Sequence, residues 1–122
     1  MKLRTRANSI RLRLTQKEVT HLAESGEVVE TLTFAPGSTL SYALAVSDGD
    51  AVRATLTGTS LRVTAPRELV RSWAASDEVG FEATQPAGDV TLSILVEKDW
   101  ACLKPRAGED DTDAYPNPNE TC

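Results

Sequence analysis

The chain has 122 residues, a formal net charge of −5 and two cysteines. This length suits a single domain with its own hydrophobic core, and the acidic balance argues against general adhesion to nucleic acid or to an anionic membrane. No apolar run has the length of a membrane span, and no signal-peptide hydrophobic region follows the basic first residues. We therefore expect a cytoplasmic protein with no membrane partner.

The hydrophobic period changes once within the first half of the chain. Residues 2–6 and 9–14 alternate charged and apolar side chains, which is typical of two half-buried strands joined by a tight turn. Thr15 and Glu18 then have the spacing of a capping box, so a helix is predicted over residues 16–25. The other predicted strands of this half cover residues 28–34 and 39–46.

The second half repeats this order of elements with an offset of 51 positions, so that Ser60 aligns with Ser9 and Val79 with Val28. Pro66 is expected at the first position of a second helix, where its missing N–H costs nothing. The predicted strands of this half cover residues 51–57, 60–65, 79–84 and 90–96.

Each half thus has the order strand, strand, helix, strand, strand, which predicts a mainly β fold with two short helices, of the α+β class. The halves, residues 1–50 and 51–98, are joined only by a turn, so a flexible linker between two separate domains is excluded. We expect them to interleave and close one pseudo-twofold β-barrel, which would bury both inner faces and remove most strand edges. Residues 99–122 are rich in acid and proline, and an irregular tail is expected there.

The second half, with a strand and a Pro-opened helix over 61–69 and an Asp-x-Val-x-Phe run over 77–81, resembles the AbrB/MazE-like swapped-hairpin barrels. Residues 6–14 resemble the opening of MazE antitoxins, in which a turn leads into a strand that carries an arginine. Single-copy members of that family form the barrel as dimers, so the resemblance implies a fused pseudo-dimer that is a monomer. The runs 8–15 and 96–103 also resemble an uncharacterised bacterial family, which implies no activity.

Basic side chains are concentrated in the first predicted hairpin. Period-two alternation places five of them on its outward face: Lys2, Arg4, Arg6, Arg11 and Arg13. The equivalent hairpin of the second half offers Arg53 and Arg62. The resemblance implies that this face binds duplex DNA, as in an antitoxin-like regulator. Two alternatives stay open, namely a charged face that protects a strand edge or pairs with the protein's own acids, and a protein-interaction module that uses the acidic tail.

Nothing in the sequence predicts catalysis, a metal site or a cofactor. His21 is the only histidine, is expected to be exposed, and has no partner nucleophile in a recognisable motif. A zinc site that combines it with Cys102 and Cys122 would lack the usual paired ligand spacing. Trp73, which replaces Leu22 on the inner face of the repeated helix, is expected to pack in the core. We therefore expect a non-enzymatic binding protein.

Overall fold

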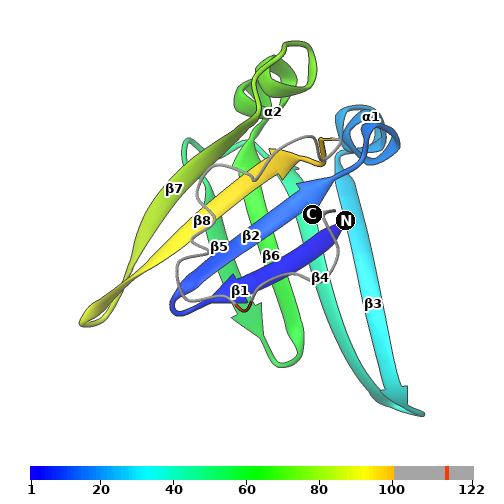
Figure 1. Cartoon of the computed structure of the whole chain (residues 1–122), viewed down its shortest axis with the longest axis vertical. Coiled ribbons are helices and arrows are strands. Elements are labelled where there is room, and N and C mark those ends of the chain that lie inside the picture. Colours follow the sequence, from blue (N-terminus) through cyan, green and yellow to red (C-terminus); the bar gives the residue numbers. More distant parts are fainter. Residues whose placement is uncertain (101–114, 116–122) are drawn as a thin grey trace.

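The computed structural model describes residues 1–100 and Tyr115. In that part of the chain, eight strands and two helices follow one another (Figure 1). Their order is β1 (Lys2–Arg6), β2 (Ser9–Leu14), α1 (Gln16–Ser25), β3 (Glu27–Ala35), β4 (Ser38–Ser47), β5 (Arg53–Thr57), β6 (Ser60–Pro66), α2 (Arg67–Ala74), β7 (Gly80–Ala87) and β8 (Val90–Lys98). The predicted α+β class is confirmed. Most of the predicted tail and both cysteines lie outside the described residues.

The first hairpin and α1 have the predicted boundaries. Ala7 takes a positive φ of 49° in the turn between β1 and β2, and Gly58 takes 57° in the equivalent turn between β5 and β6, as two-residue hairpin turns require. The Thr15 hydroxyl accepts from the N–H of Glu18, and the Glu18 carboxylate accepts from the N–H of Thr15, so the capping box is present. Gly26, with a φ of 85°, ends α1 in the left-handed conformation.

Several boundaries of the second half differ from the prediction, and β8 runs two residues further, to Lys98. The strand predicted from residue 51 begins at Arg53, because residues 48–51 form a bend. Pro66 is the last residue of β6 and the N-cap of α2 instead of the first helical residue. Residues 85–87, predicted as part of a turn, belong to β7. The sheet accepts Pro86 because β7 is an edge strand, where a missing N–H breaks no ladder.

The strands form two four-stranded sheets, each built from both halves of the chain. Sheet A has the order β1-β2-β8-β7 and sheet B the order β3-β4-β6-β5. The two central pairs, β2 with β8 and β4 with β6, are parallel, and all other pairs are antiparallel. Exchanging the halves converts one sheet order into the other, so the strand pairing has a pseudo-twofold symmetry.

The register repeats in the same way, but the sequence offset changes along the repeat. Ser9 pairs with Ser93 in sheet A, and the equivalent Ser60 pairs with Ser41 in sheet B. After the helices the offset is 53, because α2 ends earlier than α1 and a longer connection leads into β7. Val28 therefore corresponds to Phe81, and both are buried. The predicted equivalence of Val28 and Val79 was wrong, since Val79 is exposed.

The two sheets are open, so the predicted closed barrel was wrong. Closure would need backbone pairing between the edges of the sheets, whereas β1, β7, β3 and β5 each have one neighbouring strand among the described residues. Side chains link the two sheets instead. Gln85 of β7 bonds to the backbone of β5, and Tyr42 of β4 bonds to the carbonyl of Met1 beside β1. The interleaving of the halves was predicted, but the sheets pack face to face and keep their edges.

The core lies between the sheets and below the two helices, which lie together at one end of the molecule (Figure 1). Leu22 of α1 and Trp73 of α2 occupy equivalent positions and are both fully buried, as predicted. The Trp73 ring meets Phe81 edge-on at a centroid distance of 5.3 Å, and its indole N–H donates to the carbonyl of Val79. Over the described residues, neither helix has the length and apolar composition needed to cross a lipid bilayer.

Candidate interaction site

The predicted basic face exists as one outward surface of sheet A. The register of the hairpin places Lys2 opposite Arg13 and Arg4 opposite Arg11, with Arg6 opposite a serine next to the turn. Directly opposite residues share a face and are close neighbours. The five cations predicted on the first hairpin are therefore brought together.

Acidic residues of the same chain partly neutralise this face. The Nε of Arg13 donates to Glu97 of β8 at 2.7 Å, and the Nε of Arg11 lies 3.6 Å from the same carboxylate. Both arginine side chains are well covered, with 13% and 15% of their surface exposed. The Nζ of Lys2 donates to Asp99 at 2.9 Å but remains 72% exposed. The exposed cations are thus those of the edge strand β1, namely Lys2, Arg4 and Arg6.

The other two predicted site residues lie on the second sheet. Arg53 is on β5 and Arg62 on β6, both on the outward face of sheet B, and the core separates this face from the basic face of sheet A. Arg62 donates to Glu27 at 2.6 Å. The structure therefore does not bring Arg53 and Arg62 together with the five cations of the first hairpin.

The free edge of β1 lies beside these exposed cations. In a hairpin with a two-residue turn, the residue pair that closes the turn is hydrogen-bonded and alternate pairs follow it. The closing pair here is Arg6 with Ser9, so the backbone groups of Lys2, Arg4 and Arg6 face β2. Those of Leu3 and Thr5 face away from the sheet, and no described residue pairs with them.

The equivalent edge in the second half is closed by a side chain. Ala54 of β5 corresponds to Leu3, and its N–H donates to the Gln85 amide oxygen at 2.9 Å while its carbonyl accepts from the Gln85 amide nitrogen at 2.8 Å. The residue of the first half that corresponds to Gln85 is Leu32, as the pairings Leu32–Leu40 and Gln85–Leu92 show. Leucine cannot bond to a backbone edge. Within the part of the chain that the structure describes, one of the two equivalent edges is therefore capped and the other is not.

A polar cluster fixes the start of β1 against sheet B. The α-ammonium of Met1 donates to Glu18 and, at 3.0 Å, to Glu30. Burial alone would lower the pKa of this ammonium, but the hydrogen bonds to Glu18 and Glu30 outweigh it and raise that pKa. Burial alone would raise the pKa of Glu18, but the bonds from the ammonium and from the Thr15 N–H outweigh it and lower that pKa. Burial and then the charge of Glu30 raise the pKa of Tyr42, whose hydroxyl donates to the Met1 carbonyl.

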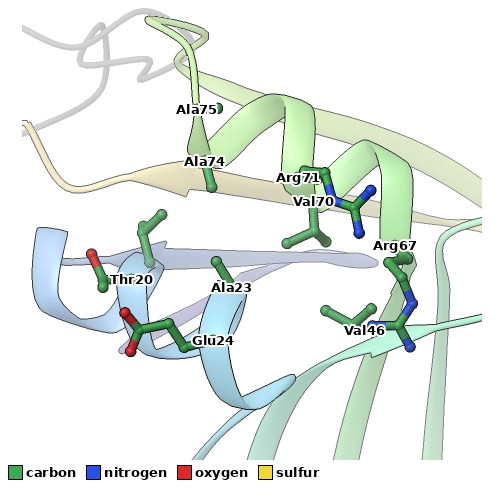
Figure 2. Close-up of a pocket in the computed structure, with 10 residues that line it drawn as sticks. Thr20, Ala23, Glu24, Val46, Arg67, Val70, Arg71, Ala74 and Ala75 are labelled. Atoms are coloured by element: carbon green, nitrogen blue, oxygen red, sulfur yellow. The ribbon is translucent and has the colours of Figure 1, made fainter.

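A shallow groove of about 340 Å³ separates the two helices (Figure 2). Small apolar side chains form its floor, among them Ala23 of α1 and Val70 of α2, and Figure 2 shows the Arg67 guanidinium beside Val46 with Glu24 projecting from α1. Arg67 and Arg71 already pair with Asp48 and Glu68 at 3.2 and 3.0 Å. These pairs are exposed and worth little. The groove is open, and among the described residues no polar or charged residue is buried.

No catalytic constellation accompanies these features in the part of the chain that the structure describes. His21 is exposed, as predicted, and its Nδ1 lies 3.4 Å from the Ser25 hydroxyl on the next helical turn. Groups of three or more histidine, cysteine or acidic side chains that could hold a metal ion do not occur among residues 1–100. The zinc ligands considered besides His21 lie outside the described residues.

A model of the DUF7009 family, described as a family of unknown function, matches residues 1–119. The chain belongs to this family. No curated protein and no solved structure shows a significant match to it. The function of this DUF7009 chain therefore has to be argued from its own surface.

Sequence reasoning missed three residues that define the site in the DUF7009 chain. Glu97 lies just beyond the predicted strand 90–96 and received no role, because the parallel pairing of β2 with β8 is a contact between distant segments. Gln85 lies in the segment predicted to separate the strands 79–84 and 90–96, together with Pro86. Leu32 was assigned to a strand with no further role. Comparing Leu32 with Gln85 at the corrected offset of the repeat would have revealed the difference between the two edges.

Proposed function

We propose that this chain is a non-catalytic protein-interaction module that recognises an acidic segment of a partner protein on the exposed cations of β1. The observation that carries this proposal is the row of Lys2, Arg4 and Arg6 along an edge strand. Acidic side chains attract such a row and fix the register of a partner. The net charge of −5 disfavours a general polyanion, since a distant phosphate backbone is repelled by the rest of the surface.

Duplex DNA is the second candidate, and the same exposed row favours it. Arginine side chains on an outward sheet face are suited to phosphates and guanine edges. The pairing of Arg11 and Arg13 with Glu97 counts against it, because those cations are already compensated. The antitoxin-like identity and the resemblance to the AbrB/MazE-like family stay predictions, as do the monomeric state, the cytoplasmic location and a contact through the acidic tail.

A binding experiment separates the two candidates. The end-blocked heptapeptide Glu-Val-Glu-Val-Glu-Val-Glu and a short duplex, both fluorescently labelled, are titrated with the full chain, and anisotropy is read at several salt concentrations. We expect the peptide to bind and the duplex not to bind. Binding to duplex, with log K falling against log salt at a slope of about −3 for three phosphate contacts, would favour the DNA candidate instead.

Matched charge variants locate the site. The triple change Lys2→Gln, Arg4→Gln and Arg6→Gln removes the exposed row, and we expect it to weaken peptide binding roughly tenfold or more. The control triple Arg53→Gln, Arg67→Gln and Arg71→Gln changes the net charge equally but leaves sheet A intact, and we expect little effect. Equal weakening by both triples, or no peptide binding at low salt, would contradict the proposal.

A further inference from the structure

We propose that the free edge of β1 is a strand-addition site, on which an extended partner segment with alternating acidic and apolar residues pairs as a fifth strand of sheet A. This inference rests on the proposed function and specifies the form of the partner. Strand addition supplies affinity through main-chain hydrogen bonds and specificity through alternate side chains.

The backbone groups needed for such pairing are present at the edge. The N–H and C=O groups of Leu3 and Thr5 face away from β2, as the hairpin register requires. Two further hydrogen bonds support the same alternation of paired and unpaired residues. Ser93 of β8 donates to the carbonyl of Asn8 and Asp99 to that of Leu14, so the even-numbered residues of β2 face β8 and the odd-numbered ones face β1. Both observations thus assign the backbone groups of Lys2, Arg4 and Arg6 to the pairing with β2 and those of Leu3 and Thr5 to the free edge.

Among the described residues, the contrast between the two halves distinguishes the edge of β1 from the equivalent edge of β5. At the equivalent edge, the Gln85 amide bonds to both backbone groups of Ala54, because its oxygen accepts from the N–H and its nitrogen donates to the carbonyl. It has Leu32 where the same amide would cap Leu3. A leucine at that position leaves the edge open and adds apolar surface next to it.

That apolar surface is the floor on which an added strand would lie. Met1 contacts Glu30 and Tyr42, so the start of β1 crosses sheet B at the level of this pair. The next inward-facing pair of β3 and β4 is Leu32 with Leu40, one step beyond β1. Leu32 is 45% exposed and Leu40 is half-buried. Apolar side chains on the inner face of an added strand would cover these two leucines.

The outer face of the added strand would lie beside the exposed cations. Residues of a partner opposite Lys2, Arg4 and Arg6 share their outward face, and residues opposite Leu3 and Thr5 point inward. Acidic residues at the outward positions and apolar residues at the inward positions therefore fit the edge. A second copy of β1 fits poorly, because like charges directly opposite one another destabilise a strand pair.

The other open edges are less suited to this role. The edge strand β3 carries a β-bulge at Phe34, which interrupts its pairing with β4 and bends the strand. The edge strand β7 carries Pro86. A β-bulge and a proline on an edge strand both disfavour pairing with another strand. β1 has neither, and its cations exclude self-pairing while they admit an acidic segment.

The decisive variant is Leu32→Gln in the full chain, which introduces the amide that caps the equivalent edge and changes no charge. We expect it to weaken binding of the end-blocked heptapeptide Glu-Val-Glu-Val-Glu-Val-Glu about tenfold or more, because the amide competes for the backbone of Leu3. Thr5→Pro removes an edge N–H and should have the same effect. Its matched control is Leu56→Pro, since Leu56 is the equivalent residue of β5, and it should leave binding unchanged.

The outcomes distinguish this inference from the proposed function. Unchanged binding in Leu32→Gln and Thr5→Pro, together with loss in the Lys2, Arg4 and Arg6 triple, would overturn strand addition and leave a purely electrostatic site. Equal binding of a peptide of the same composition with the Glu and Val residues segregated would overturn it too. A concentration-dependent dimer in light scattering that Leu32→Gln dissociates would show that a second copy occupies the edge, against the proposal. Three results together support it: loss of binding in both edge variants, unchanged binding in Leu56→Pro, and weaker binding of the segregated peptide.

Discussion

Replacing Gln85 with leucine removes the cap of the β5 edge and preserves the volume of the side chain. The two hydrogen bonds lost, at 2.9 and 2.8 Å, join the Gln85 amide to the partly buried backbone of Ala54. A net contribution of about 0.5–1.5 kcal/mol for each bond gives a loss of roughly 1–3 kcal/mol in the free energy of unfolding. For a domain of this size, that loss lowers Tm by roughly 5–20 °C.

Thermal unfolding followed by circular dichroism measures the loss, and amide exchange locates it. The Ala54 amide should lose protection in Gln85→Leu, whereas the amides of the central strands should keep theirs until global unfolding. The matched variant Leu32→Gln should be at least as stable as the unmodified chain, because it adds the same cap on the other side. An unchanged Tm with an unchanged Ala54 exchange rate would refute the view that this glutamine closes the edge.

The remaining predictions concern the N-terminal cluster, the core and the tail. Glu18→Gln keeps the capping box but loses the charge that pairs with the Met1 ammonium. The pKa of Glu18 is lowered from 4.5 and that of the ammonium raised from 8.0, so the loss should be greatest between these pH values, at about 1–2 kcal/mol, and should shrink at lower and higher pH in urea titrations. Trp73→Leu, which copies Leu22 of the first half, should cost less than the about 3–5 kcal/mol typical of Trp→Ala, and denaturant unfolding will measure this cost. Ending the chain after Arg106 removes the acidic residues of 109–113, and anisotropy should show several-fold tighter heptapeptide binding at low salt, with no gain at high salt.

Local patterns in the sequence predicted the local elements well. The period-two run, the capping box and the tight turn define β1, β2 and α1 at their true boundaries, because neighbouring residues determine all three features. Errors arose where a tertiary contact decides the structure. The longer connection after α2 and the bulge at Phe34 change the offset of the repeat from 51 to 53 and then to 52, and neither change is visible in aligned identities.

The candidate site was predicted in part for the same reason. Alternation along one hairpin correctly places five cations on one face. Whether those cations meet solvent or the chain's own acids depends on the parallel pairing of β2 with β8, which brings Arg13 next to Glu97 across most of the sequence. The sequence also could not predict that the two sheets are open. The hydrophobic pattern of a strand does not show whether its edge is paired by backbone or by a side chain such as Gln85.

Amide hydrogen exchange of Leu3 and Thr5, measured by NMR with and without the heptapeptide, tests the central claim most directly. In the peptide-free chain both amides face solvent at the edge and should exchange rapidly. The account predicts that bound peptide protects both and leaves the equivalent amide of Leu56 unchanged. Saturating peptide that leaves the exchange of Leu3 and Thr5 unaltered would contradict it.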